Sequence, residues 1–124
     1  MQPVQSAPTL RDPVAEAAEA LARGDYSAVR ERGSSLEKSA TGNALLIRAL
    51  ACLEEIPVAA SRAEEAIARH PLAPELHYLL AVLRMDQGED DAAAAAARRA
   101  LYLDPSLAMV HFTLGSVLRR RGDR

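Results

Sequence analysis

The chain has few of the residues that build disulfides, aromatic cores or membrane spans. Its 124 residues include one cysteine and no tryptophan, and aromatic side chains make up only 3%. A single cysteine excludes an internal disulfide and is typical of a reducing compartment. No run of about 18 apolar residues occurs, so no membrane insertion is expected. The first residues lack a basic region followed by an apolar run, which is the pattern of a secretory signal, so the expected location is cytoplasmic.

The charge balance argues against nucleic acid as a partner. The chain has 15 basic and 17 acidic residues, a net charge of −2 and a pI near 5.9. Proteins that bind nucleic acid usually carry a basic patch or stripe. The short arginine runs at 98–99 and 119–121 are interpreted as solvated helix surface, where cations near a helix end complement its dipole.

Alanine is the commonest residue, which favours thin, closely packed helices over strands. Prolines suited to a first helical turn and glycines suited to the residue past a helix end punctuate the pattern. These signals predict an all-α protein of about seven helices: 13–23, 26–38, 41–54, 57–70, 74–87, 90–103 and 107–121, the last capped by Ser106. Loops of two to four residues make neighbouring helices antiparallel, so the chain is expected to be a series of helical hairpins.

Identical residues recur at a spacing of 34 positions. The pairs are Pro71 and Pro105, His77 and His111, Leu80 and Leu114, and Gly88 and Gly122. This period in a chain rich in alanine and leucine resembles the tetratricopeptide repeat, a helix–turn–helix unit that stacks into a right-handed superhelix. Ala81 and Gly115 stand where that pattern needs a small residue for close helix contact.

The repeat pattern predicts one solenoid over residues 13–124, with about three and a half repeats and the last one truncated. The earlier repeats fit less well, since Ile47 stands at a small-residue position and the turns at Gly24 and Glu54 are only 30 residues apart. Residues 1–12, which hold Pro3 and Pro8, are expected to be a flexible lead-in or linker.

No catalytic, phosphate-binding or metal-binding motif is present, so the chain is not expected to be an enzyme or to hold a cofactor or metal. His77 and His111 occupy one repeat position, which favours a packing role over zinc ligation. Cys52 lies between leucines on an apolar helix and is expected to be a buried packing residue.

The first helix of each hairpin in such a solenoid lines a concave face that can bind a protein or peptide. Tyr78 and Phe112 share a repeat position, so they either face this groove or pack between repeats, and both alternatives stay open. The predicted groove residues are Arg48, Glu75, Tyr78, Val82, Met85, Asp86, Met109, Phe112, Ser116 and Arg119, with Ala44 and Ala51 from the weaker repeat.

The segments 77–81, 100–105 and 111–115 are similar to one subgroup of these repeats. They resemble the C-terminal tetratricopeptide extension of CheR-type chemotaxis-receptor methyltransferases. The resemblance implies a parent enzyme that methylates receptor glutamates with S-adenosylmethionine, which this module would dock or regulate. The implied partner is a receptor tail, a response regulator or another signalling protein.

The alternative is a freestanding tetratricopeptide adaptor or secretion-type chaperone with no attached enzyme. In either case the apolar face of the last helix, around Leu114 and Leu118, would stay partly uncovered and could support self-association.

Overall fold

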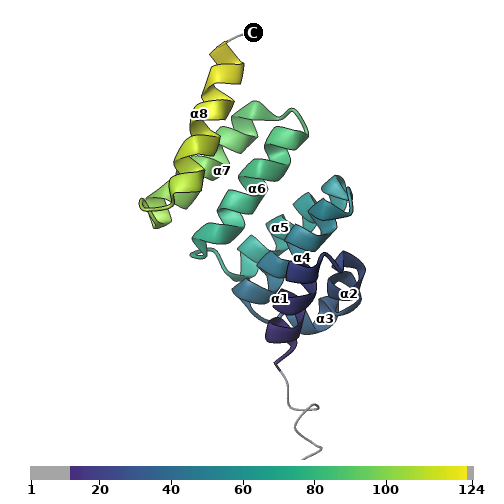
Figure 1. Ribbon diagram of the computed structural model, residues 1–124. Helices are drawn as coiled ribbons and strands as arrows, with labels where there is room; N and C mark the ends of the chain where they lie inside the picture. Colours follow the sequence, from purple (N-terminus) through teal and green to yellow (C-terminus); the bar gives the residue numbers. More distant parts are fainter. Residues whose placement is uncertain (1–11, 123–124) are drawn as a thin grey trace, which may run out of the picture.

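The computed structural model describes residues 12–122, which form eight α-helices and no strand (Figure 1). This confirms the all-α class. The helices are α1 (Pro13–Arg23), α2 (Tyr26–Glu31), α3 (Gly33–Leu36), α4 (Ala40–Cys52), α5 (Ile56–Arg69), α6 (Pro74–Asp86), α7 (Asp90–Leu103) and α8 (Ala108–Gly122).

About seven helices were expected and eight are found in the described residues, because the helix predicted over 26–38 is two short ones. The chain leaves helical geometry at Arg32, with φ −94° and ψ 14°. Gly33 and the two serines after it are weak helix formers, so little opposes the break. The break turns α3 so that Leu36 is fully buried against α4. A further difference is at the other end, where α8 continues through Gly122 instead of stopping before it.

The predicted lead-in over 1–12 lies outside the described residues except for Asp12. The Asp12 carboxylate accepts a hydrogen bond of 3.0 Å from the Val14 amide and so caps α1.

Three turns between helices have the same geometry. Gly24, Glu54 and Gly88 all adopt left-handed backbone conformations, with φ of 81°, 64° and 78°. After each, the next amide donates to a carbonyl five residues back, as in Asp25 to Ala20 at 2.8 Å. This pattern closes a helix C-terminus in the Schellman manner. The turn at Glu54 therefore belongs to the same series as the two glycine turns, despite its shorter spacing from Gly24.

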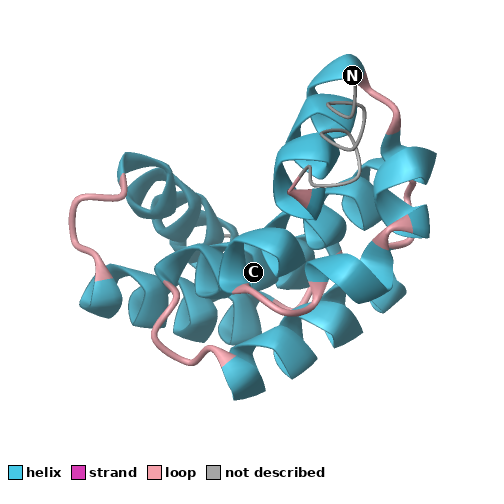
Figure 2. Cartoon of the chain, turned by 90° about the horizontal axis from the view of Figure 1, so that it is seen from below, coloured by secondary structure: helices cyan, strands magenta, loops and turns pink. Residues whose placement is uncertain are grey.

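The helices stack in sequence as an arc, which Figure 2 shows from below. α4 pairs with α5 and α6 with α7, while α8 packs on α7 and touches α6. α4, α6 and α8 lie on the face turned to the viewer in Figure 1, and α5 and α7 lie behind them. Alanines of the rear helices are almost fully buried: Ala59, Ala63 and Ala66 in α5, and Ala93, Ala97 and Ala100 in α7. These small side chains allow helix axes to approach closely.

Candidate functional site

The face made by the first helix of each hairpin contains two apolar hollows. The first, which we call the Tyr78 hollow, has a volume of about 370 Å³. It lies between α4, α6 and the start of α8. Its lining consists of Arg48, Glu75, Tyr78 and residues 106–110.

The second, which we call the Tyr26 hollow, has a volume of about 300 Å³. It lies between the N-terminal helices, α4 and α6. Its lining is almost entirely apolar: Leu21, Tyr26, Ile47, Arg48, Ala51, Cys52, Leu79, Val82 and Leu83.

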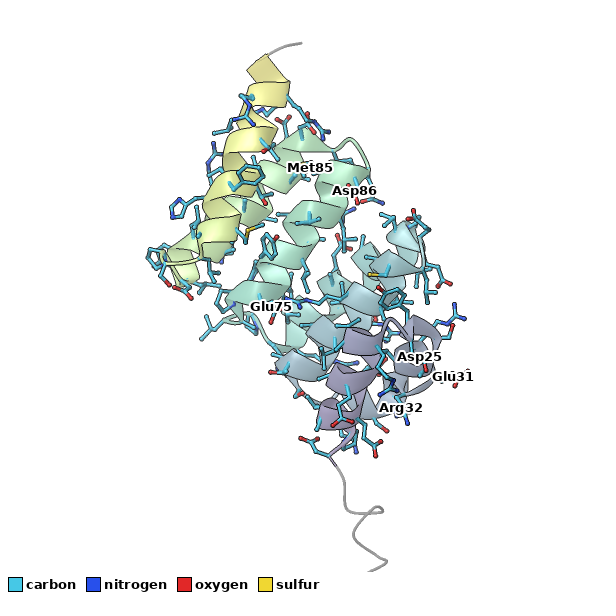
Figure 3. The ribbon with its side chains drawn as sticks, viewed as in Figure 1. Asp25, Glu31, Arg32, Glu75, Met85 and Asp86 are labelled. Atoms are coloured by element: carbon cyan, nitrogen blue, oxygen red, sulfur yellow. The ribbon has the colours of Figure 1, made fainter. Side chains whose placement is uncertain are left out.

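Arg48 belongs to both hollows and links them. Its guanidinium forms an ion pair with the Glu75 carboxylate, which connects α4 to the first turn of α6. Figure 3 labels Glu75 at that turn. Both side chains are almost half exposed, so the pair contributes little to stability. On α6, Tyr78 of one hollow is one helical turn from Val82 of the other. The two hollows therefore adjoin on one face of the protein, and they share the Arg48 side chain that pairs with Glu75.

The wall of the Tyr26 hollow holds a contact between a phenol and a thiol. The Cys52 thiol raises the pKa of Tyr26 above its ordinary value of 10.0, mainly through a hydrogen bond between the side chains and then through the thiolate charge. The expectation that Cys52 is a buried packing residue is wrong: its side chain is exposed. It is the last residue of α4 and lies where the helix end opens onto the hollow.

Five of the ten predicted groove residues line the hollows. Arg48, Glu75, Tyr78 and Met109 surround the Tyr78 hollow, and Val82 lines the Tyr26 hollow. Their role in binding stays a prediction.

The other five line neither hollow. Met85 packs against Ala93, Ala94 and Val117, while Asp86 is exposed next to it at the far end of α6 from Glu75 (Figure 3). On α8, Ser116 donates to the Phe112 carbonyl and Arg119 donates to the Ser116 hydroxyl.

Tyr78 and Phe112 have different environments although they share a repeat position. Tyr78 is half-buried and packs against the cluster around Ala81 and Val110, so it combines packing with lining a hollow. Phe112 is 68% exposed. Of the two residues from the weaker repeat, Ala51 lines the Tyr26 hollow, and Ala44 is buried in the core.

Several lining residues were missed by the sequence analysis, chiefly Leu21, Tyr26, Leu79 and Leu107. Leu21 and Tyr26 flank the Gly24 turn, in the hairpin that matches the repeat pattern least. Their position next to α4 and α6 depends on how α1 and α2 pack, and no periodic signal predicts that packing. Leu107, which the sequence predicts as the first residue of the last helix, lies in the loop directly before α8.

Two of the three histidines form a hydrogen bond with a proline carbonyl, whereas the buried Nε2 of His70 has no hydrogen-bond partner among the described residues. The ring Nε2 of His77 lies 2.9 Å from the Pro71 carbonyl oxygen, and His111 repeats this contact with Pro105 at 2.9 Å. Within residues 12–122 no three His, Cys, Asp or Glu side chains gather in a way that could hold a metal ion. No helix in that range is long and apolar enough to cross a membrane.

No protein-family model matches the sequence, and no curated protein matches it at the sequence level. The fold does match a solved structure: the type III secretion chaperone SycD of Yersinia enterocolitica, in complex with a peptide of the translocator YopD. The TM-score is 0.75 over 94% of this chain and 97% of that chain, at 13% sequence identity. At that identity the similarity establishes a shared fold, the tetratricopeptide-like stack of helical hairpins.

Proposed function

We propose that this chain is a peptide-binding adaptor or secretion-type chaperone with a cytoplasmic location. The observation that carries the proposal is the pair of adjoining apolar hollows joined at Arg48. An apolar surface of this kind on the inner face of a helical stack fits a segment that inserts a side chain into each hollow. SycD, which has the same fold, was crystallised with a peptide of a translocator.

The ligand best suited to this surface is a short apolar segment of another protein. Tyr78 and Met109 offer an aromatic and a flexible thioether surface, which adapt well to varied apolar side chains. The ion pair between Arg48 and Glu75 can hydrogen-bond the backbone of an extended chain that crosses between the hollows.

The second reading, a regulatory module of a chemotaxis-receptor methyltransferase, rests on the sequence resemblance of segments 77–81, 100–105 and 111–115 alone. The two readings share the same binding face and differ in the protein to which the face binds. We favour the chaperone or adaptor because the fold similarity extends over nearly the whole chain.

The proposal is tested by selecting peptides from a displayed library against the full chain and measuring their affinities for matched variants. Tyr78→Ala and Val82→Asp alter one hollow each and should each weaken binding by about tenfold or more, because a buried anchor residue often contributes over 1 kcal/mol. Leu72→Ala is the control, since Leu72 is 77% exposed and lines neither hollow. Circular dichroism establishes that each variant is folded.

Cys52 provides an independent readout of the same site. Because its thiol is exposed in the wall of the Tyr26 hollow, a bound peptide should slow its alkylation by a maleimide. Peptides that bind equally to all three variants and leave the alkylation rate unchanged would show that the ligand lies elsewhere.

A further inference from the structure

Equivalent repeat positions on α6 and α8 differ in burial. On α6, His77 is 7% exposed and Ala81 is 0% exposed. Their counterparts 34 residues later are His111, which is exposed, and Gly115, which is half-buried. A Cβ built on Gly115 would meet no atom within 4 Å. The side of α8 that corresponds to a covered side of α6 is therefore open.

α7 shows what covers this side on α6. Its inward residues Ala93, Ala97 and Ala100 are all 0% exposed. Alanines at these spacings form one stripe of a helix, and their small size lets α7 approach the α6 backbone. The side of α6 that corresponds to the open side of α8 is thus covered by a helix with a stripe of small residues.

The matching surface on α8 is what we call the C-terminal edge: His111, Phe112, Gly115 and Leu118. Phe112 is 68% exposed and Leu118 is 39% exposed, beside the half-buried Leu114. Apolar side chains grouped on one face in this way mark an interaction surface. The gap at Gly115 gives the edge a shape that a closely approaching helix can fill.

The charge around this edge is positive. At the equivalent place one repeat earlier, Glu64 pairs with Arg84. Arg98 stands 34 residues after Glu64, and neither Arg98 nor Arg119 forms an ion pair with a carboxylate of the described residues. By contrast, the neighbouring Arg120 pairs with Asp90 at 2.7 Å. A helix that packs on the C-terminal edge would therefore lie next to the guanidinium groups of Arg98 and Arg119, which pair with no carboxylate of the described residues.

We propose that the C-terminal edge binds a helix of a partner protein, with small residues on its apolar stripe and acidic residues beside it. Small residues are expected on the partner helix because α7, which covers the equivalent side of α6, has a stripe of alanines. Acidic residues are expected beside the stripe because Arg98 and Arg119 pair with no carboxylate of the described residues. A second copy of this chain is disfavoured as the occupant of this edge, because face-to-face pairing would bring Arg98 and Arg119 of both copies together. This surface differs from the two hollows, so the proposal does not depend on the peptide site.

The test uses a peptide that copies α7, the helix that occupies the equivalent seat on α6. The probe is a fluorescein-labelled peptide of residues 89–104 with Arg99→Glu. Position 99 is chosen because Arg99 of α7 and Glu64 of α5 line the same hollow beside α6. A carboxylate there would face Arg98 when the peptide sits on α8. Fluorescence anisotropy with the full chain should show saturable binding, and the unaltered peptide should bind about threefold more weakly at low salt.

Two substitutions at one residue make the test specific. Gly115→Leu fills the gap and should weaken binding by about tenfold or more, whereas Gly115→Ala restores the side chain found at Ala81 and should bind normally. Neither change meets a neighbouring atom at the Cβ, and circular dichroism checks folding. Val82→Asp, in the Tyr26 hollow, should leave the affinity unchanged.

Equal binding by Gly115→Leu and Gly115→Ala would overturn the proposal, as would loss of binding on Val82→Asp alone. Analytical ultracentrifugation of the chain by itself provides the remaining check. A dimer that Gly115→Leu dissociates would show that a second copy occupies the edge, and this result also overturns the proposal.

Discussion

The imidazole of His77 donates a hydrogen bond of 2.9 Å from Nε2 to the carbonyl oxygen of Pro71. A carbonyl only accepts, so this ring carries its proton on Nε2. The bond ties the second turn of α6 to the loop that precedes the helix, and the same bond joins His111 to Pro105 one repeat later. The 34-residue repeat of histidine and proline in the sequence is thus a repeated loop anchor.

The two histidine anchors should differ in their contribution to stability. His77 is 7% exposed, whereas His111 is exposed. We expect His77→Ala to lower the free energy of unfolding by about 2–3 kcal/mol through lost packing and a lost hydrogen bond. His111→Ala should lower it by about 1 kcal/mol or less. Urea denaturation measures both values, and equal losses would contradict this interpretation.

Glu54 is a site where glycine should stabilise the protein. Its φ of 64° is left-handed, as are those of Gly24 and Gly88 in the equivalent turns. A side chain in that conformation costs about 1 kcal/mol or more. Glu54→Gly should therefore raise the free energy of unfolding by about 0.5–1 kcal/mol, despite the greater freedom of glycine in the unfolded chain. Glu54→Ala, which retains a Cβ, should have almost no effect in the same urea titration.

Gly42 should tolerate no side chain. A Cβ at this position would lie 2.1 Å from the backbone carbonyl oxygen of Leu36, where α3 crosses α4. Gly42→Ala is expected to lower the free energy of unfolding by at least about 2 kcal/mol, because backbone must move. Gly115→Ala is the matched control, since that site is open and alanine favours a helix by up to about 1 kcal/mol. If thermal or urea unfolding shows that Gly42→Ala is more stable than Gly115→Ala, the close approach of the Leu36 carbonyl to Gly42 is refuted.

The pKa of Tyr26 should depend on Cys52. The largest cause that raises this pKa above 10.0 is a hydrogen bond with the Cys52 thiol. The charge of the thiolate comes second, and burial of the phenol comes third. In an ultraviolet titration of the phenols, Cys52→Ala should move the ionisation of Tyr26 down toward its ordinary value. An unchanged titration curve in Cys52→Ala would contradict the contact.

The same shift makes a prediction for stability against pH. A pKa that is higher in the folded state than in the unfolded state gives stabilisation that is complete below the unfolded value of 10.0. This stabilisation is lost as the pH rises through the folded value. The unaltered chain should therefore lose stability more steeply above pH 10.0 than Cys52→Ala does, as measured by urea unfolding at a series of pH values.

Part of the candidate site could be predicted from the repeat pattern. Glu75, Tyr78 and Met109 were predicted from the well-matched repeats, and they line the Tyr78 hollow. The prediction was incomplete for α8, because the repeat pattern treats Phe112 as equivalent to Tyr78. Their burial differs because Val110 of the next helix packs by Tyr78. The repeat pattern predicts which residues of two helices are equivalent, but it does not predict whether another helix packs against them.

Local sequence determined the helices other than α2 and α3, the left-handed turns at Gly24 and Gly88, and the 34-residue stacking unit, because each depends on residues close together in the chain. Only the tertiary structure decided that α2 and α3 are separate, that Cys52 is exposed and that Arg48 joins two hollows. These three features depend on contacts between segments that are far apart in the sequence. The free energy of such contacts depends on three-dimensional shape. The open side of α8 has the same origin, since burial is a property of neighbours and not of the helix itself.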